Sequence, residues 1–550
     1  MILVKLFLVE SPTKIKTLKK FLKNHFVFKA TSGHIKDLPK NRLGVNLNTF
    51  LPSLYYLPGK RKLLSKLKKY ILKVNEVYLA TDPDREGEAI AYHLYEYLSK
   101  INSHLKFKRI DLIEITPQGI KNALKSSRKI DLNLYQSWLT RRVMDRIIGY
   151  LISPYICKAF KKQGLSSGRV QSIALRLMVE REKEIENFVP KTNYSLEVLL
   201  KNNELSIWTE LYFKNRVFVT NEKEEIINWY KKISSESNFV LKEIKEKIET
   251  KIPPDPLKTT TLIEICQKIL GFDPKKTMKY AQNLYEKGYI TYMRTDSTRV
   301  SKYAKNMAKK FIKHYFGEEF IGQKRKISQT KFIQDAHECI RPTDVFKEDI
   351  SLSFEEKALY QVIRLYFIAS QMNSAKYLVR AYVFKNESLG KYFKLVLISK
   401  KLIFEGFLKI FPRKEKQIFL DLKKGEIFKV LECKIKTHLS KPPPRYTPAT
   451  LIKTLESMGI GRPSTYASLL DILYKRGYIE KENFYLKPTF LGIEVCDFLM
   501  NKFPEFLDYE FTVKMEEDLE KIVKNKKTYK EIVSFTYEIL KNRLEKVQNS

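Results

Sequence analysis

The chain has 550 residues, of which 43% are hydrophobic and 30% are charged. This composition indicates a folded protein of several domains and excludes a disordered one. Lys and Arg number 102 against 62 Asp and Glu, and the resulting net charge of +40 favours a phosphate-rich partner or an anionic membrane surface. The five cysteines form no Cys-x-x-Cys pair, which argues against zinc ribbons, and no apolar stretch reaches the ~18 residues of a membrane span.

The first 131 residues alternate apolar runs with helical patterns, as an α/β domain does. Strands are predicted at Val4–Val9, Val77–Ala80 and Ile110–Ile115. The third run is followed by Thr116 and Pro117, which together are typical of a helix start. The sequence therefore predicts a compact α/β domain at this end of the chain.

Three carboxylates crowd the end of the second predicted strand, namely Asp82, Asp84 and Glu86. Open α/β sheets place their sites at the carboxyl ends of strands, and like charges this close repel each other. A hard divalent cation, most simply Mg²⁺, relieves the repulsion and prefers oxygen ligands. In so basic a chain the pattern predicts a metal site that acts on a polyanion. The alternative is an exposed acidic turn with no function.

Residues 132–190 have the pattern of long helices. Arg169 and Ser172 lie opposite an apolar helix face, so we expect them to be free to contact a phosphate backbone. Arg141 and Asp145 stand one helical turn apart and are expected in the same groove, although an exposed ion pair is the alternative. The apolar face consists of Val170, Ile173, Ala174, Leu177 and Met178.

Residues 191–251 and 376–445 alternate in the manner of β-strands, and proline-rich connectors stand at or near the ends of both segments. An internal repeat falls outside them. Leu262–Ile290 aligns with Leu451–Ile479 without gaps, and eight of 29 positions are identical. Each copy predicts two helices and then a Gly-Tyr-Ile entry into a strand, which resembles a winged-helix unit.

Tyr292 and Arg294 follow the first copy of the repeat. In a strand they would face the same side, because side chains alternate with a period of two. A phenol can act as a covalent nucleophile, and a guanidinium fits the oxygens of a phosphate. The chain has 32 tyrosines, so a packing role is the alternative for this one. His337 stands in a polar run that predicts a loop, where it could hydrogen-bond a phosphate.

Several long motifs in a fixed order resemble bacterial type IA DNA topoisomerases, and among these the topoisomerase I group. The resemblance implies a multidomain α/β plus α fold, with a Rossmann-like Toprim domain at the N-terminus, two winged-helix-like units and a β-rich arch that together form a toroidal clamp. The motifs are Val9–Lys14, Thr31–His34, the acidic triad at 82, 84 and 86, Leu165–Ser172, Gly288–Ser297 and Gly459–Tyr466.

The resemblance also implies four domains. They are a Toprim domain at 1–131, a helical single-strand-binding domain at 132–190 and 446–550, an arch or hinge at 191–251 and 376–445, and a catalytic-tyrosine domain at 252–375.

The implied reaction is relaxation of negatively supercoiled DNA. Tyr292 would attack a phosphodiester of one strand and form a 5′-phosphotyrosine, the other strand would pass through the gap, and the free 3′-hydroxyl would reverse the attack. The bond is stored covalently, so no ATP is expected, and the sequence has no Walker A motif. A monomer that acts on DNA in the cytoplasm, associated with the nucleoid and not with a membrane, is expected.

The resemblance assigns a role to each matching residue. Asp82, Asp84 and Glu86, with Glu10, would hold Mg²⁺, and Glu10 would also serve the leaving oxygen. Lys14, Arg294 and His337 would join Tyr292 at the scissile phosphate. The residues expected to bind DNA are His34, Arg85, Arg141, Asp145, Ser166, Arg169, Gln171, Ser172, Arg341, Arg462, Ser464 and Thr465.

Other readings stay open at this point. The chain has no cysteine-rich zinc modules after its last helical motif, which puts processive relaxation in doubt, although the high basicity could compensate. A topoisomerase III-like decatenase is the nearest rival, and a Toprim primase or nuclease is a more distant one. A DNA architectural protein with two winged-helix units would need neither the tyrosine nor the acidic triad.

Overall fold

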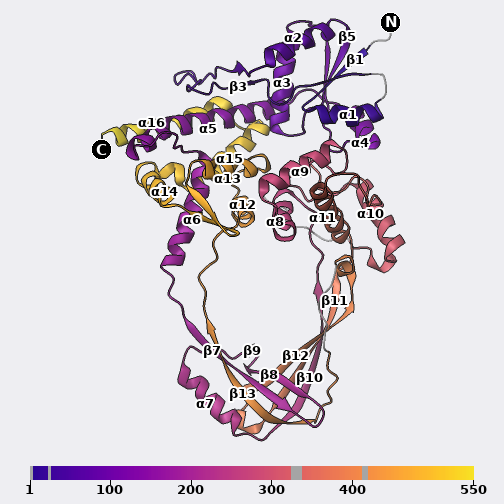
Figure 1. Cartoon of the computed structure of the whole chain (residues 1–550), viewed down its shortest axis with the longest axis vertical. Coiled ribbons are helices and arrows are strands. Elements are labelled where there is room, and N and C mark those ends of the chain that lie inside the picture. The colour runs from indigo at the N-terminus through magenta and orange to yellow at the C-terminus, as the bar shows by residue number, and fades with distance from the viewer. Residues whose placement is uncertain (1–3, 23–25, 324–336, 412–418, 550) are drawn as a thin grey trace.

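The computed structural model describes residues 4–22, 26–323, 337–411 and 419–549. These segments close into a ring around a wide central opening, with the N-terminal domain above the ring and a β-sheet arch at the opposite end (Figure 1). Within the described ranges, no helix is both long enough and apolar enough to cross a membrane. The expected toroidal arrangement is confirmed.

The N-terminal domain is built on a parallel sheet with the strand order β2-β1-β5-β6. Its strands are β1 (Val4–Val9), β2 (Phe26–Ala30), β5 (Val74–Leu79) and β6 (Lys106–Arg109). The remaining elements of this domain are α1 (Pro12–Phe21), β3 (Lys36–Asp37), β4 (Tyr55–Tyr56), α2 (Lys60–Ile71), α3 (Arg85–Ser99) and α4 (Pro117–Lys125).

The third predicted strand, Ile110–Ile115, is wrong, because β6 ends at Arg109 and the apolar run after it is irregular. The run is mostly buried, and its carbonyl groups accept hydrogen bonds from residues of another domain. The carbonyl of Leu112 accepts a hydrogen bond from the Tyr285 hydroxyl, and that of Ile113 accepts one from the backbone N–H of Tyr292. The helix start at Thr116 is confirmed, with the Thr116 hydroxyl accepting a bond from the N–H of Gly119.

A helical domain continues from the sheet. It combines two long helices that follow the N-terminal domain with the C-terminal part of the chain. Its elements are α5 (Leu132–Ala159), α6 (Arg169–Glu186), α12 (Pro448–Ser457), α13 (Pro463–Lys475), β14 (Ile479–Glu482), β15 (Tyr485–Pro488), α14 (Phe490–Lys502), η4 (Pro504–Leu507), α15 (Tyr509–Val523) and α16 (Tyr529–Gln548).

The arch is one antiparallel sheet with the order β12-β11-β10-β13-β7-β8-β9, and a further pairing of β12 with β8 closes it on itself. One helix, α7 (Lys223–Ser234), interrupts the predicted β pattern and packs against β13 and β7. The strands are β7 (Thr192–Lys201), β8 (Ser206–Phe213), β9 (Arg216–Val217), β10 (Asn238–Lys251), β11 (Ala375–Lys385), β12 (Phe393–Phe404) and β13 (Ile427–Leu439), with η2 (Glu387–Leu389) and η3 (Gly406–Ile410) beside them.

The tyrosine-bearing domain completes the ring, and its first two helices are the first copy of the internal repeat. They are α8 (Thr259–Leu270) and α9 (Pro274–Glu286), and the domain continues with α10 (Lys302–Tyr315), η1 (Glu318–Phe320) and α11 (Phe354–Ser370). At the sequence offset of 189, α9 coincides with α13 at both ends. The strand expected after each copy forms only in the second, as β14, whereas Ile290 in the first makes a single bridge with Pro342.

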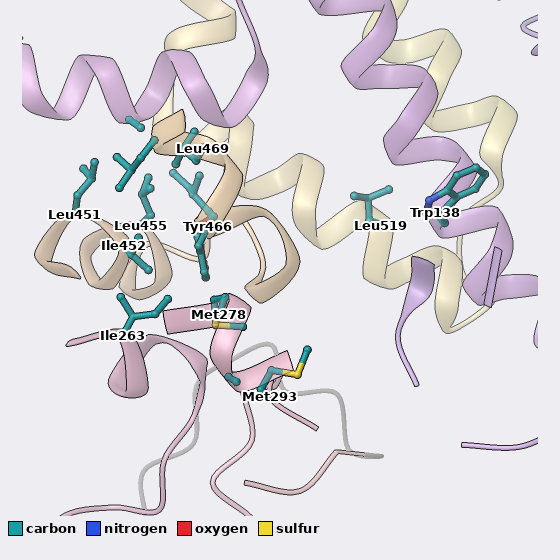
Figure 2. Close-up of a cluster of buried hydrophobic side chains, with 14 of the residues drawn as sticks. Trp138, Ile263, Met278, Met293, Leu451, Ile452, Leu455, Tyr466, Leu469 and Leu519 are labelled. Carbon is teal, nitrogen blue, oxygen red and sulfur yellow. Dashed lines mark hydrogen bonds between the residues drawn. The ribbon is translucent and has the colours of Figure 1, made fainter. Parts of the chain in front are cut away.

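The two copies of the repeat pack against each other, α8 on α12 and α9 on α13, and this contact closes the ring. We call it the seam. Figure 2 shows Ile263 and Met278 of the first copy beside Ile452 and Tyr466 of the second, within one continuous apolar cluster. Ion pairs flank the apolar contact, including Glu264 with Lys453 at 3.1 Å. The seam is thus a small interface between like units.

Candidate active site

Tyr292 lies where the tyrosine-bearing domain meets the carboxyl edge of the N-terminal sheet. Its hydroxyl donates a hydrogen bond of 2.6 Å to Asp84 Oδ2, and only 2% of the residue is exposed. Arg294 reaches the same carboxylate oxygen from 3.6 Å. The expected convergence of Tyr292 and Arg294 is therefore present, but not through a strand, because residues 291–300 are irregular.

Backbone contacts fix the position of this tyrosine. Its N–H donates to the carbonyl of Ile113 at 2.8 Å, so the segment is held by the other domain. Four residues earlier, Gly288 adopts a φ of +82°, and a Cβ there would lie 2.5 Å from the carbonyl oxygen of Ile115. Only glycine allows the two domains to approach this closely.

Glu10 and Asp82 follow the adjacent parallel strands β1 and β5, which brings them together at the sheet edge. The N–H of Asp82 donates to Glu10 Oε1 at 2.9 Å, and the Asp82 carboxylate is paired with the buried ammonium of Lys14. Burial, reinforced by the charges of Asp82 and Asp84, raises the pKa of Glu10 to about 7. Burial would lower the pKa of Lys14, but the charges of Asp82 and Glu10 outweigh it and raise the pKa.

Asp84 is the N-cap of α3, and its charge also contributes to the pKa of Tyr292. It accepts the N–H of Gly87 at 2.8 Å, and a Cβ on Gly87 would lie 2.0 Å from the carbonyl oxygen of Asp82, so glycine is needed at this turn. Burial opposes the charge on Asp84, but Arg294 and Tyr292 outweigh it and lower its pKa. Burial and the charges of Asp84 and Asp82 raise the pKa of Tyr292 well above its ordinary value, so the phenol keeps its proton in this state.

Glu86 pairs with His34 at 3.1 Å. In the described part of the chain no group of three or more His, Cys, Asp or Glu side chains is arranged to hold a metal ion. The donor chemistry nevertheless fits a divalent cation, since burial, together with the charges of Asp82 and Asp84, raises the pKa of Glu10, and a cation would offset both effects. For Glu10, Asp82, Asp84 and Glu86 to share one ion, Glu86 and Asp82 would have to leave His34 and Lys14.

A small cavity of about 60 Å³ opens beside Tyr292 and Asp84. Ligand pockets usually measure about 300 Å³ or more, so a nucleotide needs the walls to move apart. Residues of all three domains that meet at the site line this cavity, and the domains are closed around it. Its walls are Asp84, Arg85, Glu86, Trp138, Arg141, Arg294, Asp296, His337, Arg462, Pro463 and Ser464.

A larger cavity of about 850 Å³ lies along α5 and holds two of the predicted DNA-binding residues, Asp145 and Ser166. Arg169 and Ser172 do not face an open groove as expected. Arg169 is 3% exposed and pairs with Asp145 and Glu516, and the Ser172 hydroxyl bonds to that of Ser167. The periodicity indicated which helix face was apolar, but a second set of helices covers the other face.

The remaining predicted residues have diverse partners. His337 Nε2 lies 2.5 Å from the carbonyl oxygen of Pro83, on the far side of the domain boundary. Arg341 is 2% exposed and pairs with Glu338 and Glu114, so it joins the tyrosine-bearing and N-terminal domains. Gln171 donates to the carbonyl of Ser166, and the Thr465 hydroxyl accepts the N–H of Arg462.

The sequence reasoning missed the acidic partners of the arginines. Glu88 is fully buried and binds Arg109 and Arg128 behind the sheet edge. On α15, Glu516 pairs with Arg141 and Arg462, and Glu520 with Arg85 and Arg462, all of which line the cavity. The signal for the latter pair was present, because two carboxylates at i and i+4 in a strongly basic chain form the same kind of acidic exception as Asp82 and its neighbours.

Comparisons with known proteins agree with this arrangement. Residues 129–534 match the family model described as DNA topoisomerase, and residues 5–115 match the Toprim domain. DNA topoisomerase 1 of Aquifex aeolicus is 40% identical over 551 residues, 99% of this chain and 100% of that protein. DNA topoisomerase 1 of Thermotoga maritima is 41% identical over 97% of this chain and 84% of that protein.

A solved structure, full-length topoisomerase I from Thermotoga maritima, superposes with a TM-score of 0.85 at 38% identity. The match covers 98% of this chain and 90% of that one.

Proposed function

Since this chain belongs to the DNA topoisomerase family and is a type IA DNA topoisomerase, an isomerase that relaxes DNA, we propose that Tyr292 is its nucleophile. The observation that carries the proposal is the hydrogen bond of 2.6 Å from the Tyr292 hydroxyl to Asp84, at the carboxyl edge of the Toprim sheet. Negatively supercoiled DNA with a single-stranded region is the proposed substrate.

In the proposed step, the Tyr292 oxygen bonds to the phosphorus and the bond from phosphorus to the 3′-oxygen breaks. The phenolic proton passes to Asp84, its hydrogen-bond acceptor. Glu10, with its pKa of about 7, is protonated in part near neutral pH while no cation binds it, and in that state it donates a proton to the leaving 3′-oxygen. Religation is the reverse, with Glu10 taking the proton back and Asp84 returning one to the phenol.

Charge on the phosphate is stabilised by cations from two domains. Arg294 already lies 3.6 Å from Asp84, next to the nucleophile, and Lys14 lies beneath the ring of Tyr285 with its ammonium on Asp82. His337 would orient the phosphate from the other side of the cavity. Preorganised charges of this kind contribute most to rate when water is excluded.

Glu10, Asp82, Asp84 and Glu86 are the residues that would hold Mg²⁺, which when bound would add positive charge beside the scissile phosphate. The remaining residues would guide the strand. Arg85, Arg141, Arg462 and Ser464 would contact it at the cavity, with Thr465 next to Ser464, and Asp145 and Ser166 would contact it in the cavity along α5. Arg169, Gln171, Ser172 and Arg341 are buried in the closed state and would contact the strand only after the domains move apart, and His34 would lie at the margin.

The closed ring implies a gate. A strand enters the ring only if the seam and the contacts of the tyrosine-bearing domain with the Toprim domain separate, and a nucleotide enters the small cavity only if the cavity walls move apart. We take the tyrosine-bearing domain, residues 252–375, as the moving part. The phosphotyrosine conserves the energy of the broken bond, so the enzyme would work without ATP, as a monomer, on nucleoid DNA in the cytoplasm.

The test mixes the purified protein with negatively supercoiled plasmid and Mg²⁺ and omits ATP. Tyr292→Phe is compared with Tyr289→Phe, which removes a hydroxyl three residues away. In parallel, a 3′-labelled single-stranded oligonucleotide is trapped with detergent. We expect a ladder of topoisomers and a protein-linked 3′ fragment, both lost only in Tyr292→Phe. Nicking that persists in this variant would instead favour a Toprim nuclease.

A further inference from the structure

Helix α15 directs two carboxylates, one helical turn apart, into the arginine-rich wall of the active-site cavity. Glu520 Oε1 accepts from Arg85 Nη2 at 2.6 Å and lies 3.2 Å from Arg462 Nη2. Both arginines line the cavity beside Asp84 and Arg294. Glu516 lies deeper, 2.6 Å from Arg169. The cavity wall is therefore an ionic cluster assembled from four separate elements.

The two glutamates have different surroundings. Glu516 is fully buried, and although burial favours its protonated form, Arg169, Arg141 and Arg462 outweigh this and lower its pKa strongly. It is a permanent anion at the centre of the cluster. The Glu520 side chain is 19% exposed, and in the described part of the chain its ion pairs are those with Arg85 and Arg462 at the cavity, so it is the carboxylate that can leave.

Arg85 is not satisfied by this arrangement. It is 8% exposed, and its Nε and Nη1 groups are buried without a hydrogen-bond partner among the residues that the structure describes. Burial, and then the nearby charges of Arg462 and Arg141, lower its pKa despite Glu520. A guanidinium with several idle donors binds a phosphate well, because its fork contacts two oxygens at once.

We propose that the Glu520 carboxylate occupies, in the DNA-free enzyme, the position of a DNA backbone phosphate between Arg85 and Arg462. The strand displaces it on entry, and Glu520 re-forms its pairs when the strand leaves. The inference rests on the proposed function, since it requires a DNA strand at the cavity. Glu520 would thereby lower strand affinity and favour release after religation, whereas Glu516 keeps the arginines in place.

The test uses the full chain carrying Tyr292→Phe, so that binding is measured without cleavage. Glu520→Gln is compared with Glu517→Gln, which makes the same charge change on the same helix at a residue whose charge acts on Lys521. A fluorescent single-stranded oligonucleotide is titrated by anisotropy over a series of salt concentrations. We expect Glu520→Gln to bind about 3- to 10-fold more tightly than Glu517→Gln. Its dependence of log affinity on log salt should steepen by about 0.7, one more phosphate contact on a single strand.

A gain in affinity cannot come from misfolding, so the expected result is specific. Equal affinity in the two variants, or weaker binding by Glu520→Gln, overturns the inference while strand binding by the parent upholds the DNA-binding part of the proposed function. Absence of strand binding by the parent overturns both. A third variant, Glu520→Gln with Arg85→Gln, should lose the gain, and a gain that survives there would show that Arg85 is not the phosphate ligand.

Discussion

At the scale of single residues, the site holds its nucleophile protonated and hydrogen-bonded to Asp84. The phenol of Tyr292 keeps its proton because burial and two carboxylates raise its pKa. Asp84 receives this hydrogen bond and is also the N-cap of α3, so one side chain joins the fold of the Toprim domain to the nucleophile. Chemistry at Tyr292 should therefore depend on the charge of Asp84 and not only on its shape.

We predict that Asp84→Asn lowers oligonucleotide cleavage by about 10²- to 10⁴-fold, the usual range for a lost proton acceptor. Asparagine still caps a helix well, so the fold should be retained. The rate of formation of the protein-linked 3′ fragment measures the effect. Asp508→Asn, at the N-cap of α15, is the matched control and should cleave normally. Equal rates in the two variants would exclude Asp84 from the proton transfer.

A second prediction concerns pH and Mg²⁺. The pKa of Glu10 in the folded protein is about 7, above its ordinary 4.5. Its stabilising contribution is therefore complete below pH 4.5 and is lost as the pH rises through 7. Because a cation binds the carboxylate and not the acid, the rise in melting temperature caused by Mg²⁺ should be larger at pH ~8 than at pH ~6.

Differential scanning fluorimetry with and without Mg²⁺ across this range measures the effect. His34, whose pKa is raised through Glu86 against the effect of burial, titrates above its ordinary value as well. The Glu10→Gln variant distinguishes the contribution of Glu10 from that of His34. In this variant most of the pH dependence of the stabilisation by Mg²⁺ should disappear. A stabilisation by Mg²⁺ that is constant with pH in the unmodified protein would contradict the assignment of Glu10.

At the scale of elements, the sequence predicted best where one local pattern determines the outcome. The repeat at an offset of 189 predicted two helices in each copy, and the observed α9 and α13 coincide at that offset because proline starts both helices and glycine follows both. The run at Ile110–Ile115 failed as a strand because its carbonyls are used by Tyr285 and Tyr292, far away in the chain. The prediction that Arg169 is open to a phosphate backbone was wrong because its partner, Glu516, lies 347 positions later in the chain. Sequence periodicity shows which face of a helix is apolar, but it does not show which distant residues cover the opposite face.

The seam formed by the two repeats supports a third prediction. Glu264 and Lys453 are equivalent positions of the two copies, and they pair across the seam. Reversing either charge places like charges together and should ease separation, so plasmid relaxation should accelerate by about 2- to 5-fold, as expected for an exposed pair. The double reversal, Glu264→Lys with Lys453→Glu, restores the attraction and should restore the original rate.

Cleavage of a short oligonucleotide is the control, because it should not require passage of a second strand and should be equal in all four proteins. Lys268→Glu, a charge reversal on α8, reports the effect of net charge alone. A double variant that behaves like the sum of the single ones would show that the pair does not act across the seam.

At the scale of the whole molecule, the net charge of +40 extends over the surface well beyond the catalytic site. Helix α2 shows this, since in the ranges that the structure covers its exposed Arg61, Lys62, Lys66, Lys68 and Lys69 form no ion pair with an acid. Like charges on neighbouring turns destabilise a helix slightly unless a polyanion screens them. The molecule therefore carries a surface suited to holding DNA without reading its sequence.

The last prediction follows from this charge. Contacts to phosphates release counterions, so affinity falls steeply as salt rises, by about 10³-fold or more between 50 and 200 mM for six to ten contacts. If basicity holds the DNA between cycles, relaxation should be processive near 50 mM salt and distributive near 300 mM.

With substrate plasmid in excess, processive relaxation near 50 mM salt leaves fully relaxed plasmid beside untouched plasmid, and distributive relaxation near 300 mM gives a ladder of intermediates. Cleavage of an oligonucleotide by excess enzyme over the same range separates slower chemistry from earlier dissociation. An unchanged distribution of topoisomers would mean that ring closure at the seam, which encloses the strand, retains the DNA and that surface charge does not.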